Sequence, residues 1–376
     1  MPRYAHVTGW GMAVPKRVVT NAELARLVDT SDEWIVSRTG IRERRIADRQ
    51  ETTATLSERA AAQALGRTGL PARDLQLIIV ATSTPDHLFP ATACLVQDRL
   101  GASRAGAFDL SAACSGFIFA LNMAAQAIRS GALDNALVVG AETLSRFTNW
   151  EDRATCVLFG DAAGAFVLQA GDTPGGVLSC VMRSDGSGGN LLVLPAGGSR
   201  LPASRETVEK NLHTIRMNGR EVFRFATRVM AASTREAAEK AGWRIDEIDL
   251  FVPHQANLRI IEAAARSLRL PMDRFLVNID RYGNTSAASI PVAVCEALEQ
   301  GRVHPGDQLL LVGFGAGLTW GAMALQWVAR PRPLTGGERR RRRILALLAR
   351  AASFWRRQLH RLESLIWGAH HPGTPE

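Results

Sequence analysis

One cysteine in the chain has the surroundings of a nucleophile. Cys114 lies in the stretch 106–121, where a short apolar run leads into small residues and then into a helical pattern. The small neighbours allow a sharp turn, which would leave the sulfur at the first turn of the following helix. Unpaired backbone N–H groups and the helix dipole at that point favour a thiolate. The alternative is an inert buried cysteine, the usual fate of a free thiol.

A histidine and an asparagine further along the chain could serve this cysteine. His254 directly follows a β-type run, so its side chain would lie at the carboxyl edge of a sheet. Asn284 lies in a polar turn within residues 278–289. Together the three form a nucleophile with two hydrogen-bonding partners. Each partner alone also has a simpler interpretation, as a structural histidine and as ordinary turn chemistry.

The composition is that of a globular protein. The chain has 376 residues, of which 46% are hydrophobic and 22% charged, and this length predicts two or three domains. The N-terminus shows no basic segment followed by an apolar one, and no run reaches 18 apolar residues, so we expect a cytoplasmic protein. The five cysteines are odd in number and never spaced as C-x-x-C. This argues against a disulfide framework and against structural zinc.

The net charge of +9 belongs mainly to the C-terminal tail. Residues 331–376 contain ten arginines and three glutamates, which leaves about +2 for the rest of the chain. The nearly neutral body gives no reason to expect nucleic acid as a partner. Glycine-rich stretches at 185–190 and 196–198 do not follow a strand and open a helix, so we assign them no phosphate-bearing cofactor.

The body contains an internal repeat. The stretch 69–80 aligns with 242–253, each after an alanine-rich helical segment, and at the same offset Gly140 aligns with Gly313. In this alignment Cys114 falls almost opposite Asn284. Short apolar strands that alternate with helices in both halves predict two parallel-type sheets covered by helices. The alternative is chance similarity between short βα units.

At these residues the chain resembles the β-ketoacyl-acyl-carrier-protein synthase III family of the thiolase superfamily, the condensing enzymes that start bacterial fatty acid synthesis. The resemblance covers about residues 1–330 and rests on seven motifs: Ala112–Gly116, Pro253–Asn257, Gly283–Ser289, Asp32–Gly40, Trp150–Arg153, Phe159–Asp161 and Gly313–Gly317. It implies an α/β thiolase-like fold, in which two similar βα halves form a five-layered αβαβα sandwich. The first half, 1–172, would carry the nucleophile, and the second, 173–330, the histidine and asparagine. Residues 331–376 would form a linker and a basic amphipathic tail.

The resemblance also implies roles for individual residues. Cys114 would be acylated, while His254 and Asn284 would bind the thioester oxygen of malonyl-acyl carrier protein. The backbone N–H groups of Cys114 and Ala316 would form an oxyanion hole. Trp34 and Arg153 would sandwich the adenine of coenzyme A. Arg38, Gly219 and Asn257 would line the coenzyme A channel. Phe89 and Leu318 would line the acyl pocket, and Phe89 would reach it across a homodimer interface. Arg224 and Arg259 would form the docking site for the carrier protein.

These residue types suit a decarboxylative Claisen condensation of an acyl-CoA primer, with acetyl-CoA expected. Loss of carbon dioxide from a malonyl thioester produces an enolate, which needs neutral hydrogen-bond donors and no nearby carboxylate. A neutral histidine and an asparagine supply them, and neither a cofactor nor a metal is required. Two positions depart from the common family pattern. Ala316 replaces a glycine, which requires a negative φ there, and Leu318 replaces a phenylalanine.

Three other functions remain open at this stage. A papain-like cysteine protease also has Cys, His and Asn in this order, but its local signature C-G-[SA]-C-[WY] is absent. A condensing or acyltransferring enzyme of specialised metabolism, including the chalcone-synthase-like group, could have the same three residues. In a non-enzymatic protein the body would be a scaffold for the tail. Formation of a stable acyl-thioester at Cys114 would distinguish the condensing enzymes.

The tail must be interpreted from its residues alone. A Pro/Gly-rich linker at 330–337 precedes an apolar stripe with steps of three and four residues, at Ile344, Leu348, Ala351, Trp355, Leu359, Leu362 and Ile366. Arginines occupy much of the rest, at 339–343, 350, 356, 357 and 361. Such a helix, with Trp355 and Trp367 near its apolar side, suits peripheral contact of residues 338–367 with an anionic membrane. It cannot span a bilayer because arginines interrupt the apolar runs. The alternatives are packing on the body or on a dimer partner, disorder, and nucleic acid.

Overall fold

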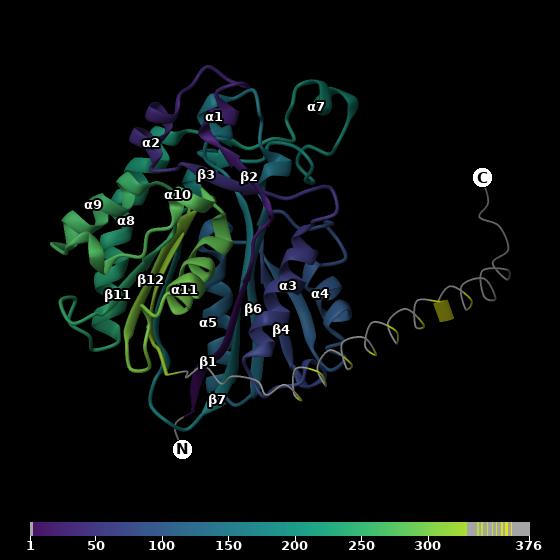
Figure 1. Cartoon of the computed structure of the whole chain (residues 1–376), viewed down its shortest axis with the longest axis vertical. Helices are drawn as coiled ribbons and strands as arrows, with labels where there is room; N and C mark the ends of the chain where they lie inside the picture. The colour runs from purple at the N-terminus through teal and green to yellow at the C-terminus, as the bar shows by residue number, and fades with distance from the viewer. Residues whose placement is uncertain are drawn as a thin grey trace.

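The structure of the chain is a computed structural model. It describes residues 3–328 and, in the tail, the nine positions Gly337, Arg340, Ile344, Leu348, Ala351, Trp355, Gln358, Leu359 and Leu362. The two sheets lie side by side in Figure 1 with helices between them and on both outer faces. The layers therefore follow the expected αβαβα order.

The first sheet has five strands in the order β1-β7-β6-β4-β5. Strands β4, β5 and β6 are parallel, whereas β7 runs antiparallel to both β6 and β1. The prediction of parallel-type sheets was therefore wrong for part of each sheet. A hairpin-like return lets a strand pair antiparallel without a crossover helix. The bounds are β1 (Tyr4–Ala13), β4 (Leu77–Ala81), β5 (Gly106–Leu110), β6 (Asn135–Thr143) and β7 (Asp161–Gly171).

The second sheet has four strands in the order β11-β12-β13-β8. Strands β11 and β12 are parallel, and β13 is antiparallel to both β12 and β8. The bounds are β8 (Gly176–Ser184), β11 (Leu250–Pro253), β12 (Gln308–Gly315) and β13 (Thr319–Gln326). Two short pairs complete the strands, β2 (Arg17–Thr20) with β3 (Glu43–Ile46) and β9 (Leu192–Val193) with β10 (Arg216–Met217).

Two helices fill the space between the sheets (Figure 1). These are α5 (Gly116–Arg129) and α11 (Ser289–Glu299), and both contact strands of the two sheets. Almost every residue of α5 is apolar or small, and Phe117 on it is fully buried against Phe166 of β7, with ring centroids 5.2 Å apart. Burial of one such side chain contributes about 1.5–3 kcal/mol, so this middle layer forms the main core.

The outer layers consist of amphipathic helices. Helices α3 (Thr53–Gly66) and α4 (Thr92–Leu100) cover the first sheet, and α8 (Gly219–Lys240) and α9 (Leu258–Leu268) pack together, with α8 against the second. Shorter helices connect these parts at α1 (Asn21–Leu24), α2 (Asp32–Thr39), α6 (Arg153–Cys156), α7 (Arg205–Glu209) and α10 (Ile279–Tyr282).

The internal repeat has a counterpart in backbone geometry. Ala113 and Ser286 are aligned by the repeat, and they have φ values of 46° and 48°, a left-handed conformation that is rare for residues other than glycine. Each opens a single 3-10 turn, η2 (Ala113–Ser115) or η6 (Ser286–Ala288), and each turn leads directly into a central helix. The two turns contact each other, so the repeat brings equivalent helix starts to one place.

Candidate active site

The turn that carries Cys114 is fixed by hydrogen bonds to its own segment and to β13. The Ser115 hydroxyl donates to the Ala112 carbonyl at 2.8 Å, and the Thr319 hydroxyl donates to the same carbonyl at 2.9 Å. On β12, a Cβ at Gly315 would lie 2.5 Å from the Cys114 backbone nitrogen. Glycine is therefore required at this position, because the turn lies directly on the strand.

Burial dominates the acidity of the thiol. Cys114 is buried, and loss of hydration raises the pKa of its thiol to about 12, although the neighbouring Ser286 hydroxyl opposes this rise. The expectation that the helix start favours a thiolate was therefore wrong, because burial opposes the thiolate. The cysteine precedes α5 within η2, and desolvation of the anion outweighs the helix dipole. Acylation thus requires a group that accepts the thiol proton.

His254 lies directly after β11, as the sequence predicted. Its backbone N–H donates to the Val312 carbonyl at 2.8 Å, and its Nδ1 is 2.6 Å from the Ser289 hydroxyl at the start of α11. The ring meets the edge of Phe314 at 5.4 Å between centroids. Burial lowers the pKa of His254 to about 3, so the imidazole is neutral at physiological pH. Within the described chain its Nε2 is buried without a hydrogen-bond partner.

Both backbone polar groups of Asn284, its N–H and its C=O, are hydrogen-bonded. Its N–H donates to Leu158 at 2.8 Å, and its carbonyl accepts from Gly160 at 3.0 Å. Its side-chain Oδ1 accepts from the Ser286 backbone N–H at 2.9 Å. Since the oxygen faces the Ser286 amide, the NH₂ end of the planar side chain faces the other way. A neutral donor is therefore available at this position.

A cavity of about 110 Å³ opens at the sulfur of Cys114. Ala316 also lines it, and this residue is absent from the described non-glycine residues with positive φ, as its methyl group requires. Leu318 is buried but does not line the cavity, and Phe89 is 87% exposed. The other lining residues are Ser83, Thr84, Ala113, Leu144, Phe147, Phe159, Leu192, Val193, Leu194, Ile215 and Ser286.

Two of the expected coenzyme A residues are stacked on each other. The guanidinium carbon of Arg153 lies 4.8 Å from the ring centroid of Trp34, and its Nη1 donates to the Asp29 carbonyl at 2.9 Å. The Asn257 amide donates to the Arg38 carbonyl at 2.9 Å, which joins α2 to the start of α9. Each pair therefore joins segments that are far apart in the sequence. The fifth residue predicted for this channel is Gly219, which lies at the start of α8.

The two arginines predicted for carrier docking are exposed on adjacent helices. Arg259 lies over the ring of Phe223, 5.5 Å from its centroid, which joins α9 to α8. Arg224 forms a 3.4 Å ion pair with Glu221 on α8. Both positive charges thus lie on the outer helical layer of the second half.

Several side chains that hold this site were not predicted from the sequence. Ser289 binds His254, and Glu142 binds the Ser286 hydroxyl, which itself bonds Cys114. Ser286 and Ser289 both occur within the motif 283–289, so their closeness to Asn284 was a usable signal. Glu142 is an acidic residue at the end of an otherwise apolar strand, and such a residue is rarely buried without a reason.

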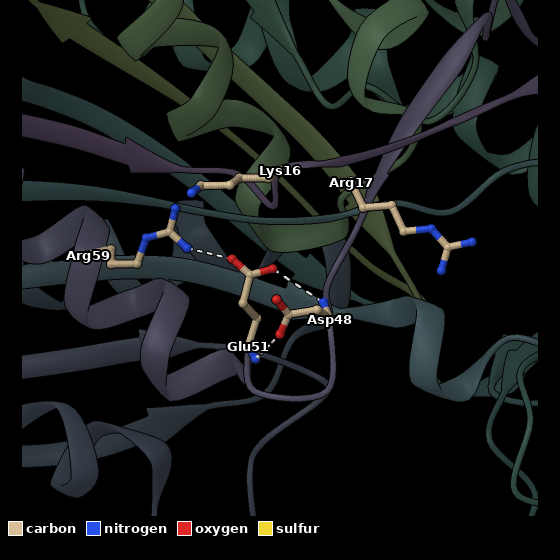
Figure 2. A pocket seen from close by; sticks show the side chains of 5 residues that line it. All are labelled: Lys16, Arg17, Asp48, Glu51 and Arg59. Atoms are coloured by element: carbon tan, nitrogen blue, oxygen red, sulfur yellow. Dashed lines mark hydrogen bonds and ion pairs between the residues drawn. The ribbon is translucent and has the colours of Figure 1, made fainter.

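A second hollow, of about 570 Å³, is shown in Figure 2. It is lined by charged residues, and Arg59 bonds Glu51 at 2.6 Å while the Glu51 N–H bonds Asp48 at 3.0 Å. Lys16 and Arg17 complete the lining. None of the predicted site residues lies here, and the two carboxylates stabilise the loop that carries them.

The chain is similar to known proteins over most of its length. The sequence model of the 3-oxoacyl-[acyl-carrier-protein] synthase III family matches residues 108–186, and that of its C-terminal part matches residues 238–327. A β-ketoacyl-[acyl-carrier-protein] synthase III from a Roseiflexus species is 57% identical over 329 residues, which cover 88% of this chain and the whole of the relative. The chain belongs to the β-ketoacyl-acyl-carrier-protein synthase III family.

Solved structures agree with this assignment to synthase III. The Aquifex aeolicus 3-oxoacyl-[acyl-carrier-protein] synthase III is 48% identical, with a TM-score of 0.80 over 86% of this chain and all of that one. A priming β-ketosynthase from a polyketide biosynthetic pathway is 37% identical, with a TM-score of 0.82 over 88% and 98%. The chain is thus a condensing acyltransferase with the thiolase fold, and the protease and scaffold alternatives are wrong.

The residues that the structure describes lack two further features. They include no helix long and apolar enough to cross a membrane. They also include no cluster of three or more histidine, cysteine or acidic residues that could hold a metal ion.

Proposed function

We propose that this synthase III condenses a short acyl-CoA primer with malonyl-acyl carrier protein to give 3-ketoacyl-acyl carrier protein. The buried His254 with a free Nε2 carries the proposal. A neutral imidazole whose Nδ1 accepts from Ser289 bears its proton on Nε2, where it can donate to a thioester oxygen. The NH₂ of Asn284 supplies a second donor. Two neutral donors suit the enolate that forms when malonyl thioester loses carbon dioxide.

The covalent half of the reaction uses Cys114. Its sulfur attacks the acyl carbon of the primer, and coenzyme A leaves as its thiolate. The backbone N–H groups of Cys114 and Ala316 are the proposed donors to the tetrahedral oxyanion, and both residues line the cavity. The enolate then attacks the acyl-cysteine, and the Cys114 sulfur is released. This route needs no cofactor besides the coenzyme A thioester itself.

Separate measurement of the two half-reactions tests this division of roles. Cys114→Ala is expected to abolish acylation by radioactive acetyl-CoA, because no thioester can form. His254→Ala and Asn284→Ala are expected to acylate still but to lose malonyl decarboxylation, by roughly 100-fold or more. Covalent acyl transfer to the Cys114→Ala protein, or equal loss of both half-reactions in His254→Ala, would overturn the assignment.

The cavity supports a short primer. Its volume of about 110 Å³ and its leucine, valine, isoleucine and phenylalanine side chains suit a small apolar acyl group. Acetyl-CoA is the proposed primer, and turnover with acetyl-, butyryl- and isobutyryl-CoA would test it. Apolar pockets discriminate by about 1–3 kcal/mol per methylene, so a preference for acetyl of at least roughly tenfold is expected. A preference for longer primers would favour a polyketide-type role instead.

The carrier protein is proposed to dock at Arg259 and Arg224. Carrier proteins are acidic, and both arginines are exposed on α8 and α9. Arg259→Glu is expected to raise the KM for malonyl carrier protein and to leave acetyl-CoA kinetics unchanged. Arg266→Glu, an exposed arginine further along the same helix, is the matched control. An equal effect of Arg259→Glu on both substrates would contradict the docking role.

A homodimer is proposed from the apolar loop before α4. Leu88 is 80% exposed and Phe89 is 87% exposed. Large apolar side chains that are exposed next to each other usually mark an interface with another protein chain. Sedimentation of the native protein is expected to give a dimer, and Phe89→Asp is expected to weaken both the dimer and turnover. A monomeric active protein would contradict this proposal.

We also propose that the tail binds an anionic membrane surface. Part of the predicted stripe lies within the described residues: these positions are helical, and the five large side chains are 49–64% exposed, at Ile344, Leu348, Trp355, Leu359 and Leu362. Ile366, Trp367 and all the predicted arginines except Arg340 lie outside the described residues. In the sequence, residues 339–361 include nine arginines and no acidic residue. Each basic residue close to an anionic bilayer contributes about 1 kcal/mol to binding. The arginines and the apolar stripe therefore both favour an anionic membrane surface as the partner.

Vesicle binding tests the membrane proposal. Full-length protein is expected to co-sediment with vesicles that contain phosphatidylglycerol, to be released by salt, and to ignore pure phosphatidylcholine. Leu348→Asp with Leu359→Asp is expected to abolish binding, whereas Val208→Asp, an exposed apolar position on the body, is the control. Removal of the chain after Arg330 is expected to abolish binding and to keep condensing activity. Absence of binding at low salt, or unfolding of the shortened protein, would favour a helix packed on the body or the dimer partner.

A further inference from the structure

Glu142 is a buried carboxyl that the steps above do not use. It is the penultimate residue of β6, has no exposed surface, and forms no ion pair within the described chain. Its oxygens accept hydrogen bonds from Thr84 at 2.6 Å, from Thr82 at 3.3 Å and from the Ser83 N–H at 3.1 Å. A carboxylate without a cation partner is costly to bury, so its presence at this position indicates a role other than stabilising the fold.

The carboxyl is poised to gain and lose a proton near neutral pH. Loss of hydration raises the pKa of Glu142 to about 7, and the surrounding hydroxyl and N–H donors offset only part of this rise. The groups that face it from the segment after β4 are Thr82, Ser83 and Thr84, and η6 contributes Ser286. Both its protonated and its ionised form are therefore populated under working conditions.

One hydroxyl connects this carboxyl to the sulfur. The Ser286 hydroxyl donates to Glu142 Oε1 at 2.9 Å, which leaves its oxygen to accept from the thiol of Cys114, whose pKa this hydroxyl influences. Its position is fixed, because the backbone has φ +48° and the Ser286 N–H is bound by Asn284. Ser286 and Cys114 line the same cavity. A continuous path for a proton thus runs from Sγ through one hydroxyl to a carboxylate.

A negative charge on Glu142 disfavours a negative charge on the Cys114 sulfur. The negative charge of Glu142 raises the pKa of the Cys114 thiol, so a thiolate and a carboxylate together are unfavourable. The other titratable side chain of the site, His254, is neutral and bonded to Ser289 instead. The pair therefore tolerates a single negative charge, which can move from the carboxylate to the sulfur as a proton moves the other way.

We propose that Glu142 stores the thiol proton of Cys114 during the acyl-cysteine stage, acting through the Ser286 hydroxyl. This inference rests on the proposed function. As the S–H bond breaks and the S–C bond forms, the thiol proton passes to Ser286 Oγ, and the Ser286 proton passes to Glu142. The departing coenzyme A thiolate takes its proton from solvent. When condensation breaks the S–C bond, the sulfur leaves with the electron pair and regains the stored proton by the reverse path.

Glu142 touches no substrate, so it is a positioning residue for this proton. Its signature is the pH dependence of acylation, followed as acetyl transfer from acetyl-CoA to the peptide that contains Cys114. The wild type is expected to acylate faster as pH rises, with an inflection near pH 7, because the ionised carboxylate is the acceptor. Glu142→Gln keeps a hydrogen bond but accepts no proton. It is expected to lose the inflection and roughly 100-fold of the rate at neutral pH.

Two further variants separate a proton path from a structural role. Glu142→Asp restores a carboxylate and is expected to recover the inflection, at a reduced rate. Ser286→Ala breaks the path, and the φ of +46° at Ala113 shows that alanine adopts this backbone conformation in the equivalent turn, η2. It is expected to lose the inflection as Glu142→Gln does. Asp161→Asn, which neutralises a buried carboxylate bonded to Ser145, is the control that should leave the profile unchanged.

Retention of the inflection in Glu142→Gln or in Ser286→Ala would overturn the proposal. So would a Glu142→Asp protein with the flat profile of Glu142→Gln, since the carboxylate would then act only by packing. Iodoacetamide labelling of Cys114 at the same pH values gives an independent readout without any substrate. Failure of the proposed condensation would abolish ketoacyl product in all proteins, whereas failure of the proton path would leave that product and remove only the pH difference.

Discussion

Substitution of Ser289 by alanine tests whether the orientation of His254 drives decarboxylation. The two side chains are 2.6 Å apart, and both are buried, with exposed fractions of 1% and 2%. Because Nε2 must donate to the substrate, Nδ1 must accept, and the Ser289 hydroxyl is its donor. Removal of one partner from a buried hydrogen bond costs about 1–3 kcal/mol. If this loss falls on the transition state, decarboxylation slows by about 5- to 160-fold.

The assay compares the two half-reactions in the same protein. Ser289→Ala is expected to slow release of carbon dioxide from malonyl carrier protein within that range and to change acetyl transfer to Cys114 by less than about threefold. Ser179→Ala is the matched control, since this buried serine also makes a 2.6 Å bond, to the Ala237 carbonyl on α8. An unchanged decarboxylation rate, or equal slowing of acetyl transfer, would refute the role given to the Ser289 hydroxyl.

Three further outcomes are expected. Malonyl decarboxylation should be constant between about pH 5 and 8, because a pKa lowered to about 3 keeps His254 neutral throughout, and a fall in rate below pH 7 would contradict this. Gly315→Ala should slow acylation and destabilise the fold by about 1–3 kcal/mol in thermal unfolding, because its Cβ would lie 2.5 Å from the Cys114 backbone nitrogen. Gly313→Ala should destabilise the fold less, because its Cβ would lie 3.4 Å from the nearest atom. Trp34→Ala should raise the KM for acetyl-CoA by about 5- to 20-fold through lost stacking and leave malonyl decarboxylation unaffected.

Local patterns predicted much of the architecture. The internal repeat predicted two related halves, and the family resemblance predicted the five layers and the condensing activity. The expected strand before His254 is confirmed as β11. These features depend on neighbours in the sequence or on a pattern that repeats, so the sequence alone contains them.

Properties that depend on the whole assembled core could not be predicted in this way. Helix-dipole reasoning at Cys114 considered only the adjacent turn, whereas the pKa is set by everything that excludes water from the sulfur. Glu142 lies 144 residues from Ser286, and no spacing rule connects them. The antiparallel direction of β7 and β13 likewise depends on which edge of a sheet the chain returns to.

The matched turns at Ala113 and Ser286 bear on the history of the chain. Tandem duplication of one half explains two equal left-handed turns at equivalent positions, each at the start of a central helix. At the same offset the position equivalent to Cys114 is Ala287, so only the first of the two turns carries a sulfur. The two turns thus share one backbone conformation and differ in chemistry, since the first presents the sulfur of Cys114 and the second presents Ser286 beside Asn284.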